Sequence, residues 1–183
     1  MNTPSIAALE AILFAAPRPF TLKELAVHLD CTVPEAHKLL QELEQRLAAD
    51  PNRGLMVDRV AHGYRLATKP ELGEYVARVS EVIRTSSLSQ AALETLAIVA
   101  YRGPVTRAEI EAIRGVRSDS AINALLERGL IEECGRKEAP GRPVLFQTTS
   151  DFLLHFGLND LSELPPLPDK PEPPAHLPFA EPL

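Results

Sequence analysis

A stretch near the start of the chain, residues 7–24, recurs at residues 91–109, and this repeat constrains the fold most. Residues 7–10 and 91–94 both read Ala-Ala-Leu-Glu. Three further residues, Pro19, Thr21 and Glu24, recur 85 positions later. A repeat of this length exceeds the roughly 20–50 residues of solenoid units. The pattern therefore predicts one small domain used twice, which is typical of a scaffold or a binding protein.

The first copy predicts three helices and a β-hairpin. Apolar residues recur at helical spacing over residues 5–16. Thr21 and Glu24 form a capping box at the start of a second helix, and Thr32 caps a third. Apolar residues on both sides of His62-Gly63 then predict a hairpin with a glycine-containing turn. Three helices followed by a hairpin are typical of a winged helix, that is, a helix-turn-helix with an added β-wing.

The second copy repeats this order. Ser89, Thr106 and Ser118 are expected to cap its three helices, with Ile110 and Ile113 in the core. Residues 130–134 and 144–148 predict the two wing strands, and a last helix begins near residue 149. A helix over residues 71–83 links the copies, and its apolar side is supplied by Leu72, Tyr75, Val76, Val79 and Ile83.

We therefore expect a mainly α fold with small β-wings (α+β) in three parts. Residues 1–84 form the first winged-helix domain with its linker helix, and residues 85–167 form the second. Residues 165–183 contain eight prolines, so residues 168–183 are expected to be a disordered tail, because they have too little apolar surface to offset their ordering entropy. The alternative is a proline-rich recognition segment.

The charge argues against DNA recognition. The net charge is -6, and regions 1–84, 85–164 and 165–183 carry -1, -3 and -2. A DNA-binding protein needs a basic face that displaces phosphate counterions. The first third helix, residues 35–46, has three glutamates and two cations, and the second is small and partly apolar. We expect no direct sequence-specific DNA binding, although the basic residues of the second wing leave a wing contact open.

No motif for catalysis, metal or cofactor binding stands out. The five histidines form no metal-ligand pair, and no phosphate-binding glycine loop or nucleophile elbow occurs. We expect no cofactor, no metal and no enzymatic activity. Cys31 and Cys134 are expected to be reduced, mostly buried thiols. The sequence has neither a signal-peptide pattern nor about 18 consecutive apolar residues, so a cytoplasmic protein without a membrane span is expected.

Several runs in the second copy follow one another in a highly specific order. They are residues 92–101 (ALETLAIVAY), 104–110 (PVTRAEI), 113–116 (IRGV), 125–131 (LLERGLI), 135–137 (GRK), 140–143 (PGRP) and 152–158 (FLLHFGL), closing with 161–166. In these runs the chain resembles the segregation and condensation protein B family. The resemblance is dense over residues 89–167 and looser over residues 1–84.

The resemblance implies a non-enzymatic subunit of the bacterial condensin-like complex, with two winged-helix domains. It implies a homodimer, formed chiefly through the first domain, that binds the kleisin subunit, segregation and condensation protein A. That kleisin closes a ring with the structural-maintenance-of-chromosomes ATPase. The expected role is chromosome condensation and partition during cell division, in the cytoplasm and at the nucleoid through the complex.

Five arginines of the second domain are expected to form part of the kleisin contact: Arg107, Arg114, Arg117, Arg136 and Arg142. They could equally be solvated or pair with neighbouring glutamates. The dimer contact is expected on the helices of residues 5–47. The competing hypothesis is a winged-helix transcription regulator that reads DNA. A third possibility, an unrecognised enzyme, requires a pocket with convergent titratable groups.

Overall fold

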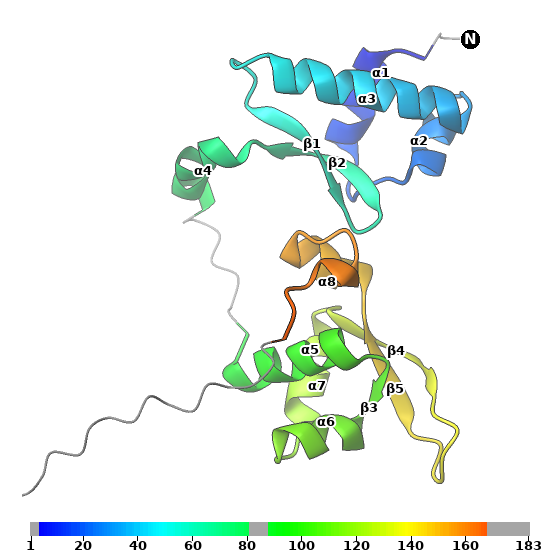
Figure 1. Cartoon of the computed structure of the whole chain (residues 1–183), viewed down its shortest axis with the longest axis vertical. Helices are drawn as coiled ribbons and strands as arrows, with labels where there is room; N and C mark the ends of the chain where they lie inside the picture. Colours follow the sequence, from blue (N-terminus) through cyan, green and yellow to red (C-terminus); the bar gives the residue numbers. More distant parts are fainter. Residues whose placement is uncertain (1–3, 81–87, 168–183) are drawn as a thin grey trace, which may run out of the picture.

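The computed structural model describes residues 4–80 and 88–167, here named the N-terminal half and the C-terminal half (Figure 1). These residues form a mixed α/β structure with eight α-helices and two small antiparallel sheets. The proline-rich tail predicted for residues 168–183 lies outside the described residues, as do residues 81–83 of the predicted linker helix. No helix in the described ranges is long and apolar enough to cross a membrane.

In the N-terminal half, three helices precede a hairpin. The elements are α1 (Ile6–Ala15), α2 (Leu22–His28), α3 (Val33–Ala49), β1 (Leu55–Val60) and β2 (Gly63–Thr68). The predicted capping box at α2 is confirmed: Thr21 Oγ1 accepts from the Glu24 N–H at 3.3 Å, and the Glu24 carboxylate accepts from the Thr21 N–H at 2.8 Å. Thr32 caps α3 in the same way. Such boxes satisfy N–H groups that the first helical turn leaves without partners.

The core of this half is formed by the apolar faces of its three helices. Its buried members are Leu9, Leu13, Leu25, Ala26, Leu29, Ala36, Leu40, Leu43 and Leu47. Phe20, Tyr64 and Leu66 are half-buried against this cluster, so β2 covers it from one side. Burial of aliphatic side chains at about 25 cal/mol per Å² is the main term that holds helices and hairpin together.

The hairpin turn differs from the prediction by one residue. The turn residues are Ala61 and His62, with φ of 49° and 61°, rather than His62 and Gly63. Gly63 is the first residue of β2 and is buried, and a Cβ there would lie 2.9 Å from the Pro19 Cβ. The glycine is therefore needed for the close approach of two chain segments, which local turn patterns do not reveal.

The C-terminal half repeats this order with one further strand, and a helix again follows its hairpin. Its elements are α5 (Gln90–Arg102), β3 (Val105–Thr106), α6 (Arg107–Arg114), α7 (Asp119–Glu127), β4 (Ile131–Arg136), β5 (Val144–Thr148) and α8 (Ser150–Phe156). The sheet order is β3-β5-β4. The short strand β3 was not predicted. Its counterpart in the N-terminal half is Phe20, which forms a single bridge with Tyr64 of β2.

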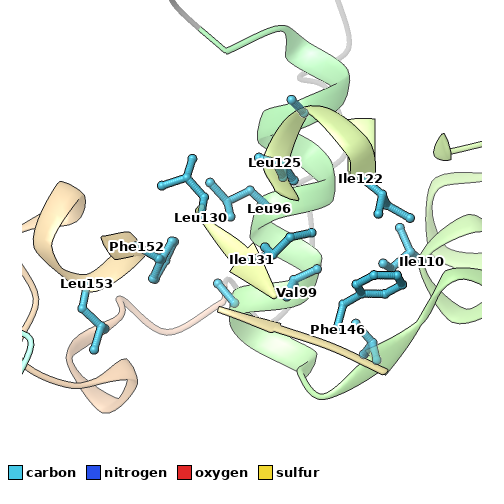
Figure 2. Packing of buried hydrophobic residues seen from close by; sticks show 13 residues of the cluster. Leu96, Val99, Ile110, Ile122, Leu125, Leu130, Ile131, Phe146, Phe152 and Leu153 are labelled. Atoms are coloured by element: carbon cyan, nitrogen blue, oxygen red, sulfur yellow. The ribbon is translucent and has the colours of Figure 1, made fainter. Parts of the chain in front are cut away.

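The core of the C-terminal half gathers around α5. Figure 2 shows Leu96 and Val99 of α5 among side chains from α6, α7 and the sheet, with Phe152 and Leu153 of α8 at the margin of the cluster. Ile110 is fully buried as predicted, but Ile113 is 56% exposed, which corrects its assignment to the core. The eight residues of α6 bury one narrow stripe, and Ile113 lies off it.

Two other predictions for this half are also corrected. Ser118 occupies the N-cap position of α7, but its side chain accepts no helical N–H. Both cysteines are free; Cys31 is half-buried but Cys134 is exposed. The reason is that β4 extends beyond the core, so that only Ile131 of its six residues is buried.

The linker helix begins two residues later than predicted, and its apolar side is open within the described residues. The 3-10 turn η1 (Pro70–Leu72) leads into α4 (Gly73–Ser80). Tyr75 and Val79 are 66% and 71% exposed.

The two halves meet at the turn of the first hairpin. The Ala61 N–H donates to the Leu158 carbonyl at 2.9 Å, and the His62 N–H donates to Asn159 Oδ1 at 3.1 Å. Ala61 also packs against the core of the C-terminal half. In Figure 1, α8 accordingly lies between this turn and the remainder of the C-terminal half.

Candidate partner-binding surface

The five predicted arginines lie on α6, on the loop after it and on the β4–β5 hairpin. Arg107 and Arg114 are the first and last residues of α6, and Arg117 precedes α7. Arg136 ends β4, and Arg142 lies in the connection to β5. Figure 1 shows α6 and this hairpin at the end of the C-terminal half that is remote from the N-terminal half. We call these five residues the arginine surface.

Arg114 is the least accessible of the five, with a side chain only 7% exposed. Its guanidinium pairs with Glu94 of α5 at 3.2 Å and donates to Ser118 Oγ at 2.9 Å. Gly115, in the left-handed conformation at φ 72°, turns the chain so that α7 starts beside the end of α6. The Ser118 N–H is satisfied by the Glu111 carboxylate at 3.0 Å. Arg114 therefore joins α5, α6 and α7 by charge-assisted hydrogen bonds.

The other four arginines are exposed. Arg107 forms an ion pair with Asp119 at the start of α7, with both side chains about half exposed. The Arg136 guanidinium donates to the Arg142 carbonyl at 3.1 Å and so holds the hairpin tip, where Arg142 has φ of 41°. The Arg117 carbonyl accepts from Arg114. These exposed guanidinium groups can bind carboxylates or peptide carbonyls of a partner.

A further ion pair fixes the hairpin against α6. Lys137 Nζ lies 2.5 Å from Glu109 Oε1. The other Glu109 oxygen accepts from the Thr106 N–H and hydroxyl in the capping box of α6. Lys137, followed by these Thr106 hydrogen bonds, lowers the pKa of Glu109 to about 2. Sequence reasoning missed this pair, because the two residues are 28 positions apart and no local spacing links them.

Three exposed apolar residues lie within two positions of Glu94 or Arg114 in the sequence. Leu93 is 44% exposed, and Ile113 and Val116 are each 56% exposed. We call these three residues the apolar patch. Arginines beside apolar side chains are a frequent composition at protein interfaces. A signal in the sequence could have revealed the patch: its apolar residues adjoin charged residues and fall outside the periodic positions that form the buried face of a helix.

The leucines after α8 differ in burial. Leu158 and Leu164 pack against the core of the C-terminal half. Leu161 and Leu167 are 39% and 53% exposed.

The described residues contain no group of three or more potential metal ligands. A cleft of about 530 Å³ in the C-terminal half, bordered by the turn of the first hairpin, is lined by three titratable residues, His62, Glu132 and Asp160, among others. Both carboxylates accept hydrogen bonds from the protein: Glu132 accepts from the Gln147 amide at 2.8 Å, and Asp160 accepts from the Ser162 N–H at 2.9 Å. The Ser162 hydrogen bonds lower the pKa of Asp160.

A model of the family described as "Segregation and condensation complex subunit ScpB" matches residues 7–167. Segregation and condensation protein B of Symbiobacterium thermophilum is 53% identical over 159 residues, which cover 87% of this chain and 72% of that protein. The protein of the same name from Desulforamulus reducens is 52% identical over 160 residues, covering 87% of each chain.

Two solved structures with similar sequences carry the name ScpB in their descriptions. The crystal structure of ScpB from Mycobacterium tuberculosis is 37% identical, covers 84% of this chain and 94% of its own, and has a TM-score of 0.40. A dimer of an ScpB N-terminal domain complexed with ScpA peptide is 31% identical, covers 40% of this chain and 91% of its own, and has a TM-score of 0.38. With TM-scores this low, neither supports a statement about the arrangement of this chain.

Proposed function

Because this chain belongs to the family of segregation and condensation complex subunit ScpB, we propose that it is a non-enzymatic adaptor of a bacterial condensin-like complex. Its role is to support chromosome condensation and partition during cell division, in the cytoplasm and at the nucleoid through the complex. The observation that carries this proposal is the continuous family match over residues 7–167, which includes both copies of the repeat.

We infer further that each half is a winged-helix domain, with boundaries at residues 1–84 and 85–167. Support comes from the shared order of three helices and a hairpin. It also comes from an equivalent pairing ahead of the second helix, where Phe20 bridges Tyr64 in one half and Val105 pairs with Phe146 in the other. The matching bridge makes a common ancestor of the two halves the simplest explanation of the repeat.

The partner proposed for the arginine surface is the kleisin subunit, segregation and condensation protein A. Arg107 is already paired with Asp119. Arg117, Arg136 and Arg142 offer exposed cationic groups, and the apolar patch offers surface to bury. Arg114 serves this contact indirectly, by holding the helices that carry it.

The homodimer contact is proposed on the helices of residues 5–47. Val27 and Val33 on these helices are 77% and 40% exposed, and burial of such side chains favours association. The kleisin then links this dimer to the structural-maintenance-of-chromosomes ATPase.

Charge pairing supports a protein partner over DNA. Arg107 is paired with Asp119 at the start of α7, and Lys137 of the second hairpin is paired with Glu109. A transcription regulator would need these cations for phosphate contacts. A salt titration of duplex binding separates the two hypotheses, because tight binding that falls steeply with salt would contradict the adaptor proposal.

The direct test is co-purification of the full chain with the kleisin subunit. The double variant Arg117→Glu/Arg142→Glu reverses two exposed charges of the arginine surface and should weaken the complex at least about tenfold. Arg59→Glu, at an exposed position of β1, is the matched control and should bind as the native chain does. Equal binding by all three chains would remove the arginine surface from the contact, whereas no binding by the native chain would refute the adaptor proposal.

A further inference from the structure

The outer edge of β2 is open along residues 66–68. Phe20 and Tyr64 exchange both backbone hydrogen bonds, at 3.0 and 2.8 Å, so the backbone polar groups of Tyr64 point away from β1. These groups alternate sides along a strand, so those of Leu66 and Thr68 point the same way. Within residues 4–80 and 88–167, no backbone partner pairs with Leu66 or Thr68 at this edge. Such an edge is a template for another strand.

A groove of about 350 Å³ lies beside this open edge. Residues 16–19 form one wall and residues 65–68 of β2 form the other. Most of the remaining lining is apolar and includes Leu13, Phe14 and Leu154. Phe14 is 80% exposed, so this aromatic ring is uncovered by the described residues. The groove therefore offers apolar surface next to unpaired backbone groups.

The corresponding groove in the C-terminal half is bordered by the chain itself. There Gly103 and Pro104 face residues 147–149 across a cleft whose lining also includes Leu161, from the segment after α8. The end of the described chain thus already runs beside one copy of this groove. The same segment contacts the first hairpin through Leu158 and Asn159, which brings it close to the N-terminal half.

The sequence beyond Leu167 contains a segment with the pattern of an edge strand. Its prolines at 174, 178 and 182 all occupy even positions, and its odd positions are Ala175, Leu177, Phe179, Glu181 and Leu183. A strand that pairs along one edge uses the N–H groups of every second residue. Proline is tolerated where the N–H would face solvent. All five odd residues can donate, and four of them are apolar.

We propose that residues 175–183 of the same chain pair with the open edge of β2 as an additional strand, with Leu177 and Phe179 in the groove beside Phe14. Residues that pair across two strands place their side chains on the same face. Odd tail residues opposite Leu66 therefore face the side on which Leu66 packs against the core.

The length of the tail agrees with this occupant. Sixteen residues follow Leu167, and they span about 50 Å when extended, compared with about 20 Å for β2. The segment lies outside the family match, which ends at residue 167, so the inference concerns this chain rather than the family.

The test compares three full-length chains by amide hydrogen exchange at Leu66 and Thr68. Leu177→Asp/Phe179→Asp places charge at odd positions, and the matched control His176→Asp/Ala180→Asp adds charge at even positions. Native and control chains should exchange these amides at least about tenfold more slowly than the odd-position variant. The chain has no tryptophan, so Phe14→Trp provides a second readout, with emission at shorter wavelength when the tail is docked.

Equal exchange in all three chains would overturn the proposal. Loss of protection in the control as well would overturn the strand register. Protection that increases with protein concentration would mean that a second copy supplies the segment, and would overturn its assignment to the same chain. The amides of Leu9 and Leu40, in the buried core, show in each chain that the fold is intact.

Discussion

Removing the Arg114 side chain should cost far more stability than removing the neighbouring Arg107 side chain. Arg114 is 7% exposed and donates to Glu94 and to the buried Ser118 hydroxyl, whereas Arg107 and its partner Asp119 are about half exposed. A hydrogen bond to a charged group contributes about 1.5–3 kcal/mol, and an exposed ion pair contributes about 0–1 kcal/mol. Arg114→Ala should therefore lower the free energy of unfolding by about 2–3 kcal/mol, and Arg107→Ala by at most about 1 kcal/mol.

Urea denaturation measures this difference, with the slope m compared between chains to verify that the same surface is exposed on unfolding. For a domain of this size, a loss of 2–3 kcal/mol also lowers Tm by roughly 8–24 °C. If the two halves unfold separately, only the transition of the C-terminal half should move. Equal destabilisation by the two alanine variants would refute the assignment of Arg114 to the junction of α5, α6 and α7.

Three further predictions address other parts of the molecule. Gly63→Ala should lower stability by about 1–3 kcal/mol in thermal denaturation because a Cβ has no room there, while Gly73→Ala, with open space around it, should not; equal effects would contradict the close-packing argument. The folded-state pKa of Glu109 is about 2, below its ordinary 4.5, so the stabilisation of the fold by its carboxylate is complete above pH 4.5 and is lost as the pH falls towards 2. Lys137→Met should raise the pKa of Glu109 in an NMR titration, and an unchanged pKa would exclude the ion pair in solution. Asn159→Ala removes a hydrogen bond between the halves, so small-angle scattering should show a broader range of overall dimensions; an unchanged profile would show that this bond does not restrain them.

Local signals explain what the sequence predicted well. The capping boxes at Thr21 and Thr106 involve residues three positions apart, so their chemistry is visible in a short window. The hydrophobic periodicity of α3 and α5 likewise reports which face is buried. The hairpin strands were placed to within one or two residues because apolar residues and glycines mark their ends.

Contacts between distant segments explain the rest. The strand β3 has only two residues, and only its pairing with β5 makes it a strand. Gly63 was assigned to the turn because its contact with Pro19, across 44 positions of sequence, cannot be seen locally. Arg114 looked like a surface arginine because its partner Glu94 is 20 positions away on another helix. From the sequence the five arginines look alike, and it does not show that Arg114 is held in hydrogen bonds within the fold while the other four are exposed.

The contact between the first hairpin and the segment after α8 also sets an order of events during synthesis. His62 and Asn159 are 97 positions apart, and at 5–20 residues per second the second is made about 5–20 s after the first. The N-terminal half has a complete core of its own and can fold in that interval. Its orientation relative to the C-terminal half is therefore fixed late, after a period in which the nascent first half can meet another protein unrestrained by the second.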